Sequence, residues 1–254
     1  MSIAARISST VRASASLVVV SPCNSILFML RPSKGTFPKT HVFPGGALDE
    51  SDISLEYCAV RETYEETGLL ILPQKDLTHT PVVHERGRFP GYREAVVSTT
   101  GIDPLKLDWS SNSGLSRLSE WTTPTALKQK KRFVTQFFVY FSEEKLDFSH
   151  ISPNNEVQKV EWLTATQALE DFKTGKVALM PPQFYLLSSI KESGVLTSIK
   201  LLSDRKFQPS LKKKYDDGRI ELDWGKGESG ILTYDGEGVI RDIQHVRNHN
   251  ISQL

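Results

Sequence analysis

Three glutamates, Glu62, Glu65 and Glu66, stand at positions i, i+3 and i+4 of one short segment. On a helix this spacing places their carboxylates on one face. Like charges crowded in this way repel one another, and oxygen ligands of this kind suit Mg²⁺ or Mn²⁺. The spacing therefore predicts that these three residues are metal ligands. The alternative is a solvated acidic helix face, which is common in Glu-rich helices.

The chain around the glutamates predicts a helix of about four turns, entered from a glycine-rich loop. Apolar and small residues recur at helical spacing from Leu55 to Thr63, Ser54 is available as N-cap, and Gly68 stands just past the end. The double glycine Gly45-Gly46 and an acidic stretch precede this helix. The glutamates are thus expected on a capped helix next to a loop that allows close approach of the backbone.

Alternating and β-branched runs place strands on both sides of this helix. Residues 16–20 and 25–30 read as a hairpin or as two sequential strands, and residues 31–46 as a loop. From residue 217 on, two Asp-Gly turns separate alternating segments, which predicts a β-rich C-terminal extension. Further extended segments are expected over 69–72, 81–84, 131–141 and 156–163, and further helices over 92–98, 164–172 and 183–190. This order predicts an α/β (α+β) fold, an α/β/α sandwich around a mixed sheet.

The composition excludes several classes of partner. The 254 residues are 39% apolar and 24% charged with a formal net charge of +1, so neither nucleic acid nor a charged membrane is expected to bind. No apolar run approaches the roughly 20 residues that span a bilayer. Cys23 and Cys58 lie in separate segments, which fits a reducing compartment without a disulfide framework. The oligomeric state is not indicated.

The segment around the glutamates resembles the Nudix box, G-x5-E-x7-R-E-U-x-E-E-x-G-U, in which U is aliphatic. Residues 61–69 match its second half, except that Thr63 stands where an aliphatic residue is usual. Gly46 corresponds to the first glycine and Asp52 to the first glutamate, with eight rather than seven residues between Asp52 and Arg61. The chain is therefore similar to the Nudix hydrolases, which cleave diphosphates with the help of divalent metal ions.

The resemblance implies a role for each carboxylate. Glu62 and Glu66 would bind Mg²⁺ or Mn²⁺, and Glu65 would bind the metal or orient a base. The expected catalytic residues are Glu65, Glu66 and Glu156. The segment that begins with Glu156 resembles the strand that follows the box in many Nudix enzymes, where a glutamate binds metal or acts as base. A surface glutamate at the start of a strand is the alternative for Glu156.

A narrower resemblance, to the peroxisomal Nudix coenzyme A diphosphatases of animals and fungi, covers roughly residues 14–190. It is carried by residues 31–33, 41–49, 121–124, 131–133 with 135 and 137–138, and 179–185. It implies hydrolysis of coenzyme A or acyl-CoA to 3′,5′-ADP and 4′-phosphopantetheine or its acyl form. The alternatives are hydrolysis of another small nucleotide such as ADP-ribose or NADH, and an inactive Nudix-fold binding module. The chain has Val134 where an Asp is expected, and it lacks a longer insertion before the helix.

Two arginines are candidates for binding the substrate phosphates. Arg31 and Arg132 lie in segments of the narrower resemblance, and guanidinium groups suit phosphate oxygens. An ordinary ion pair at a strand end is the alternative for each. We expect a flexible N-terminus over 1–13, a Nudix hydrolase domain over 14–195, and a C-terminal extension over 196–254 that packs on the same domain.

The two ends of the sequence carry weak targeting signals. The first twelve residues contain Arg6 and Arg12 and no acid, which is weakly like a mitochondrial transit segment. Ser252-Gln253-Leu254 differs in one residue from the Ser-Lys-Leu peroxisomal address. Together with the resemblance, this predicts a peroxisomal location and a peroxisomal import receptor as partner. Mitochondrion and cytosol are the alternatives.

Overall fold

Two long parallel strands, β1 (Val11–Val20) and β8 (Arg132–Phe141), form the centre of the fold. They pair in register from Val11 with Arg132 to Val20 with Phe141. The computed structural model describes residues 11–33, 38–73, 81–85, 87–88, 90–125 and 132–247. Successive side chains of a strand point to opposite faces of its sheet. Val18 and Val20 accordingly join the apolar cluster on one face, and Leu17 and Val19 that on the other.

The described strands around this pair make an eight-stranded mixed sheet with the order β10-β7-β8-β1-β2-β3. Off this path, β4 pairs with β1 and β9 pairs with β2. The bounds are β2 (Ser25–Leu30), β3 (His41–Val42), β4 (Gly45–Ala47), β7 (Ser116–Thr122), β9 (Lys159–Thr164) and β10 (Lys206–Phe207). The mixed sheet and the hairpin of β1 with β2 confirm the expectations from the sequence.

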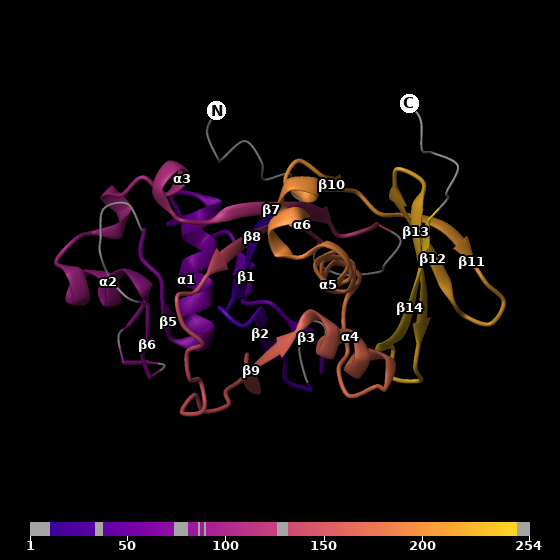
Figure 1. Ribbon diagram of the computed structural model, residues 1–254, viewed down its shortest axis with the longest axis horizontal. Coiled ribbons are helices and arrows are strands. Elements are labelled where there is room, and N and C mark those ends of the chain that lie inside the picture. Colours follow the sequence, from indigo (N-terminus) through magenta and orange to yellow (C-terminus); the bar gives the residue numbers. More distant parts are fainter. Residues whose placement is uncertain are drawn as a thin grey trace.

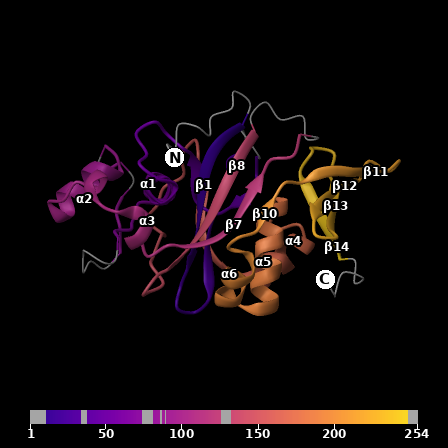
Figure 2. The ribbon, with the colours of Figure 1, turned by 90° about the horizontal axis from the view of Figure 1, so that it is seen from above.

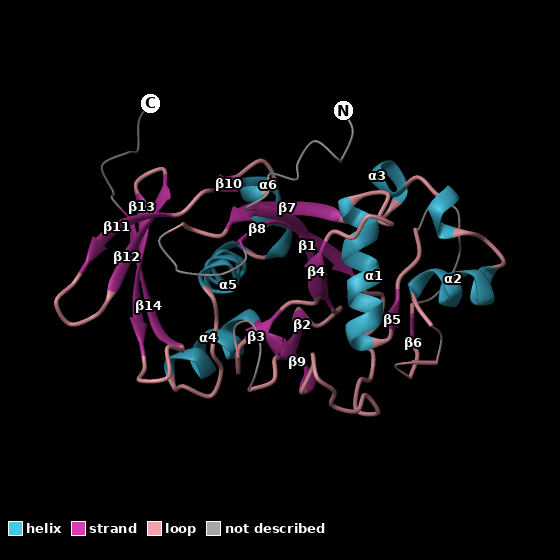
Figure 3. Cartoon of the chain, turned by 180° about the vertical axis from the view of Figure 1, so that it is seen from behind, coloured by secondary structure: helices cyan, strands magenta, loops and turns pink. Residues whose placement is uncertain are grey.

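Helices cover both faces of this sheet (Figures 1 and 2). One face carries α1 (Leu55–Thr67), with α2 (Tyr92–Thr100), α3 (Trp109–Asn112), the 3₁₀ turn Pro104–Lys106 and the small sheet of β5 (Leu69–Leu70) and β6 (Val82–Val83) beyond it. The other face carries α4 (Ala165–Lys173), α5 (Pro181–Ser193) and α6 (Val195–Leu202). Figure 3 shows the same layers from behind. The predicted α/β/α arrangement is confirmed.

Helix α1 begins and ends at the residues that the sequence indicated. The Ser54 hydroxyl accepts a hydrogen bond from the backbone N–H of Tyr57 at 3.0 Å, as an N-cap does. Gly68 adopts the left-handed conformation, with φ of 73°, and its N–H donates to the carbonyl of Tyr64 at 2.7 Å. A Cβ on Gly68 would lie 2.0 Å from the carbonyl oxygen of His84, so a larger residue does not fit at this turn.

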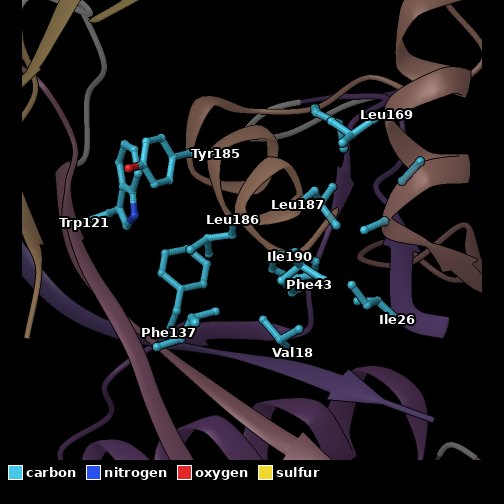
Figure 4. Close-up of a cluster of buried hydrophobic side chains, with 14 of the residues drawn as sticks. Val18, Ile26, Phe43, Trp121, Phe137, Leu169, Tyr185, Leu186, Leu187 and Ile190 are labelled. Carbon is cyan, nitrogen blue, oxygen red and sulfur yellow. The ribbon is translucent and has the colours of Figure 1, made fainter. Parts of the chain in front are cut away.

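The C-terminal strands form an antiparallel meander next to α5. Its strands are β11 (Ser210–Lys214), β12 (Ile220–Gly225), β13 (Glu228–Tyr234) and β14 (Ile240–Arg247). Leu222 and Trp224 of this meander belong to the same apolar cluster as Tyr185 and Leu186 of α5. Figure 4 shows α5 side chains of this cluster, among them Tyr185, Leu186 and Ile190, facing Trp121, Phe137 and Phe43. The C-terminal extension therefore shares a core with the helices of the second face.

Several boundaries differ from the expectations. Residues 31–46, expected as a loop, contain β3 and the start of β4, because these short strands pair with β2 and β1 rather than follow a local pattern. Strand β9 begins at Lys159, not at Glu156, since the Asn154 side chain accepts hydrogen bonds from the backbone N–H groups of Glu156 and Val157 and holds a turn there. Strand β7 and helix α6 were not predicted.

The expected domain boundaries also shift. Residues 11–13, assigned from the sequence to a flexible N-terminus, belong to β1, and the boundary expected after residue 195 would cut α6. Residues 1–10 and Ser252–Leu254, which carry the targeting signals, and Lys131 lie outside the described residues. Within the described ranges, no helix is long and apolar enough to cross a bilayer.

Candidate functional site

Two glutamates of α1 lie directly against the glycines of β4. Glu66 Oε2 accepts a hydrogen bond from the backbone N–H of Gly45 at 2.8 Å. A Cβ on Gly46 would lie 2.4 Å from the carboxyl carbon of Glu62, and a Cβ on Gly45 would lie 2.3 Å from the carbonyl oxygen of Ala15. The two glycines thus let β4 lie between β1 and α1, which brings the backbone of β4 to the carboxylates.

The guanidinium group of Arg61 connects three acids around this point. Its Nε and Nη2 donate to the two oxygens of Asp52 at 2.7 and 2.8 Å. Its Nη1 lies 3.0 Å from Glu62 Oε1 and 3.0 Å from Glu65 Oε2. The Asp52 side chain is completely buried, so Asp52 anchors Arg61 and does not face the open side of the glutamate cluster. Such bidentate pairs fix the orientation of a guanidinium group.

Burial raises the pKa values of Glu62, Glu65 and Glu66. Burial raises the pKa of Glu66 to about 8, although the hydrogen bond from Gly45 and the charge of Arg31 oppose it. The pKa values of Glu62 and Glu65 are raised for the same first reason, and the charge of Arg61 acts against this. The charge of Glu156 adds to the rise at Glu65 and Glu66, so Glu156 lies within electrostatic reach of both.

The donor chemistry of this cluster fits a hard divalent cation. All its ligand atoms are carboxylate oxygens, and a bound cation would stabilise their ionised form, which burial and the neighbouring carboxylates disfavour. In the ranges that the structure describes, however, no three acidic, His or Cys side chains are already gathered as a ligand set. Arg61 forms ion pairs with both Glu62 and Glu65, which accounts for why these two carboxylates are not turned towards a shared cation position. Glu62 and Glu66, which both lie against β4, are the pair that fits a cation most directly.

A pocket of about 330 Å³ opens beside β4 on the opposite face of the sheet from α1. Its floor is made by β4, β1, β8 and β7, and its walls come from the start of α5 and from the C-terminal segment. Among the described lining residues only Arg31 carries a charge. Its Nε is buried and has no hydrogen-bond partner in the described structure. The lining residues are Ser14, Ala15, Ser16, Arg31, Val42, Phe43, Gly45, Gly46, Ala47, Trp121, Thr122, Thr123, Pro124, Phe133, Thr135, Phe137, Met180, Pro181, Pro182, Gln183, Pro209 and Leu222.

Comparison with known proteins identifies the family and the fold. A model of the NUDT19 Nudix domain matches residues 52–190, which is more than half of the 254-residue chain. The chain belongs to the NUDT19 Nudix domain family. Nudix hydrolases generally use divalent metal ions, in agreement with the carboxylate cluster on α1.

Curated relatives and a solved structure agree with this family. The acyl-coenzyme A diphosphatase NUDT19 of Xenopus laevis is 32% identical over an alignment that covers 57% of this chain and 41% of that protein. The protein of the same name from Gallus gallus is 26% identical over an alignment that covers 73% of this chain and 66% of that protein. The chain thus spans less than two thirds of either relative. A NUDIX hydrolase from Alicyclobacillus acidocaldarius has the same fold, with a TM-score of 0.56 at 22% identity over 77% of this chain and 99% of that one.

The structure brings some of the predicted site residues of this Nudix domain together. Arg31 lines the pocket, and its charge lowers the pKa of Glu66 against the effect of burial. Glu156 is exposed in the turn before β9, near Glu65 and Glu66. Arg132 is not among the described pocket residues, and its Nε donates to the carbonyl of Thr123 at 3.0 Å. Its role as a phosphate ligand stays a prediction.

Several pocket residues of the Nudix domain were not given a role from the sequence. Trp121 and Gln183 lie in two of the segments that carried the family resemblance, so their position in the pocket was detectable in principle. Pro209 and Leu222 lie beyond the matched residues 52–190 and have no motif around them. Only the packing of the C-terminal segment against α5 shows that they reach the pocket.

Proposed function

We propose that this protein is a divalent-metal-dependent hydrolase that cleaves the diphosphate of coenzyme A or acyl-CoA. The products are 3′,5′-ADP and 4′-phosphopantetheine or its acyl form. The observation that carries the proposal is that Gly45 and Gly46, which contact Glu66 and Glu62, line the same pocket as Arg31, whose buried Nε lacks a partner among the described residues. The names of the relatives from Xenopus laevis and Gallus gallus support the choice of substrate.

The reaction requires one water molecule and one base. The water oxygen forms a bond to one phosphorus of the diphosphate, and the bond from that phosphorus to the bridging oxygen breaks. The bridging oxygen leaves with the other phosphate, and the proton of the water passes to a carboxylate. Glu65, Glu66 and Glu156 are the carboxylates that we propose for orienting the water and accepting this proton.

Substrate binding assigns different tasks to the charged groups. The guanidinium group of Arg31 would donate hydrogen bonds to oxygens of the diphosphate, which its planar shape favours. Glu62, Glu65 and Glu66 would hold Mg²⁺ or Mn²⁺, which neutralises phosphate oxygens and lowers the pKa of a bound water. Arg61 would keep the carboxylates in place through its anchor on Asp52.

A turnover assay with purified protein tests the proposal. The protein is incubated with Mg²⁺ or Mn²⁺ and with coenzyme A, an acyl-CoA, ADP-ribose or NADH, and the products are separated by chromatography. We expect 3′,5′-ADP from the coenzyme A compounds, no turnover after chelation of the metal, and a higher kcat/KM than for the other two substrates. Preference for ADP-ribose or NADH would assign the other hydrolase class. Binding of coenzyme A without cleavage of any substrate would assign a binding module.

The location in the cell stays a prediction. It rests on the family resemblance and on Ser252-Gln253-Leu254, which lie outside the described residues. Fluorescently tagged protein with a free C-terminus is compared with a version that lacks the last three residues. We expect the full chain in peroxisomes and the shortened chain outside them; the same distribution for both would contradict the prediction.

A further inference from the structure

The pocket beside β4 runs across several strands. Its floor crosses from β4 through β1 and β8 to β7, which is three strand spacings or roughly 14 Å. Arg31, Gly45 and Gly46 lie at the end next to the glutamates, and Trp121 of β7 lies towards the other end. The pocket is therefore long enough to take an extended part of a substrate whose diphosphate lies at Arg31.

The charge of the lining side chains indicates which part of the substrate the pocket binds. Arg31 is the one charged side chain among the described lining residues, and aromatic, aliphatic and proline side chains make up most of the rest. The nucleotide half of coenzyme A carries an additional phosphate on its ribose, and a buried phosphate without positive partners is costly. The pantetheine half is uncharged beyond its phosphate. The pocket suits the uncharged half.

Besides Nε of Arg31, two further buried polar atoms of the pocket residues lack partners in the described structure. They are Nε1 of Trp121, a hydrogen-bond donor, and Oε1 of Gln183, an acceptor. The two residues line the pocket and are only 3% and 7% exposed. Buried polar groups without partners are rare because each costs free energy. An amide group of a ligand offers one acceptor and one donor, which complements this pair.

The C-terminal segment completes the wall of the pocket. Leu222 of β12 lines the pocket and is 1% exposed. The meander that carries Leu222 is joined to α5 by polar side chains: Tyr185 donates to Glu228 at 2.9 Å, and Arg205 contacts both of them. The family match ends at residue 190, before this wall.

From these observations we infer that the pocket binds the amide-bearing pantetheine arm of the substrate, with Trp121 and Gln183 as its hydrogen-bond partners. Leu222 limits how far an acyl chain extends beyond that arm. The nucleotide lies outside the pocket, on the other side of the diphosphate. This inference rests on the proposed function for the identity of the substrate, but the binding of the arm is measurable without any turnover.

Binding of pantetheine, which has no phosphate, is the first test. Isothermal titration calorimetry compares the unchanged protein with Trp121→Phe, Gln183→Leu and Trp224→Phe. Trp224 is the matched control, because its Nε1 is also buried without a described partner but the residue does not line the pocket. We expect Trp121→Phe and Gln183→Leu each to weaken binding by roughly three- to tenfold, and Trp224→Phe to leave it unchanged. Thermal unfolding shows whether each variant is folded.

Steady-state kinetics is the second test and separates the arm from the nucleotide. Trp121→Phe and Gln183→Leu should raise KM for coenzyme A and leave the kinetics with ADP-ribose unchanged, because ADP-ribose has no such arm. Leu222→Ala should shift the preferred acyl-CoA to longer chains, and Leu222→Phe to shorter ones.

The possible results distinguish this inference from the proposed function. Cleavage of coenzyme A without measurable pantetheine binding, and with KM unchanged in both pocket variants, overturns the inference and leaves the proposed function intact. Pantetheine binding that the two variants weaken, in a protein that cleaves none of the substrates, supports the inference and removes the proposed function. Binding of 3′,5′-ADP that pantetheine displaces and the variants weaken would place the nucleotide in the pocket and overturn the inference.

Discussion

The carboxylate of Glu66 accepts a hydrogen bond from the backbone N–H of Gly45 at 2.8 Å, so a side chain of α1 binds the backbone of β4 directly. Glu66 is thereby fixed against a residue that lines the pocket, and it lies within electrostatic reach of Arg31 and Glu62. Glu66 thus has a structural role, the hydrogen bond from Gly45, and a proposed chemical role at the metal site. A substitution that keeps the hydrogen bond but removes the charge distinguishes the two.

Glu66→Gln should strongly reduce turnover with little effect on the fold. Glutamine keeps an oxygen that accepts from Gly45 but loses the negative charge, so we expect kcat to fall by about two or more orders of magnitude. The rise of the melting temperature on addition of Mg²⁺ or Mn²⁺ should also shrink. Glu170→Gln, on the exposed side of α4, is the control. Near-normal activity with unchanged metal dependence would contradict the metal assignment.

Asp52→Asn should destabilise the protein and weaken catalysis together. The substitution removes a buried partner of Arg61, and breaking a buried ion pair typically costs about 3–5 kcal/mol. Arg61 is then free to neutralise Glu62 and Glu65 more fully, which should weaken metal binding. Chemical denaturation and metal titration measure the two effects. Glu237→Gln breaks the exposed pair with Lys39 and should change the free energy of unfolding by less than about 1 kcal/mol. Equal effects of both substitutions would refute the anchoring role of Asp52.

Gly45→Ala should prevent correct folding around the site. A Cβ would lie 2.3 Å from the carbonyl oxygen of Ala15, and Gly45 has a φ of 151°, which other residues rarely adopt. Gly238→Ala is the matched control, since Gly238 also has a positive φ, of 78°, but has open space around its Cα. We expect insoluble or strongly destabilised protein for the first variant and a cost of about 1 kcal/mol for the second. Soluble yield and the melting temperature provide the measurement.

Glu228 should stabilise the C-terminal sheet in a pH-dependent way. Burial acts to raise its pKa, but contacts with His245, Arg205 and Tyr185 outweigh burial and lower the pKa to about 2. An acid whose folded pKa is depressed stabilises the fold above its unfolded pKa and loses this effect as the pH falls through the folded value. Glu228→Gln should therefore cost about 3 kcal/mol at neutral pH, and the difference from the unchanged protein should disappear between about pH 4.5 and pH 2. A difference that does not vary with pH would show that the ionised carboxylate contributes nothing.

The sequence predicted the parts of the site that depend on local structure. Glu62, Glu65 and Glu66 share a face because helical spacing alone decides it, and Ser54 and Gly68 bound the helix through local hydrogen bonds. The mixed α/β fold followed from the order of the helical and extended segments in the same way.

The remaining parts depend on pairings between distant segments. Gly45 meets Glu66 only because β4 pairs with β1, and three residues of β4 do not show this as a local pattern. The sequence indicated Asp52 as the first acidic residue of the Nudix box. Its hydrogen bond from Arg61, however, depends on the conformation of the chain between the two residues. Leu222 reaches the pocket through the packing of two separate sheets, for which the sequence contains no periodic signal.

The parallel pairing of β1 with β8 also has a consequence for biosynthesis. Ser14 and Thr135 pair in register although they stand 121 positions apart. During synthesis, β1 therefore emerges from the ribosome well before β8, the strand with which it pairs. At about 5–20 residues per second this delay is on the order of ten seconds. During that time an apolar strand has an unpaired edge, which favours aggregation. The meander of β11 to β14, in contrast, pairs each strand with the next and is ready to fold as soon as it is synthesised. Slower growth at low temperature and chaperones that shield exposed strands should therefore raise the soluble yield of this chain.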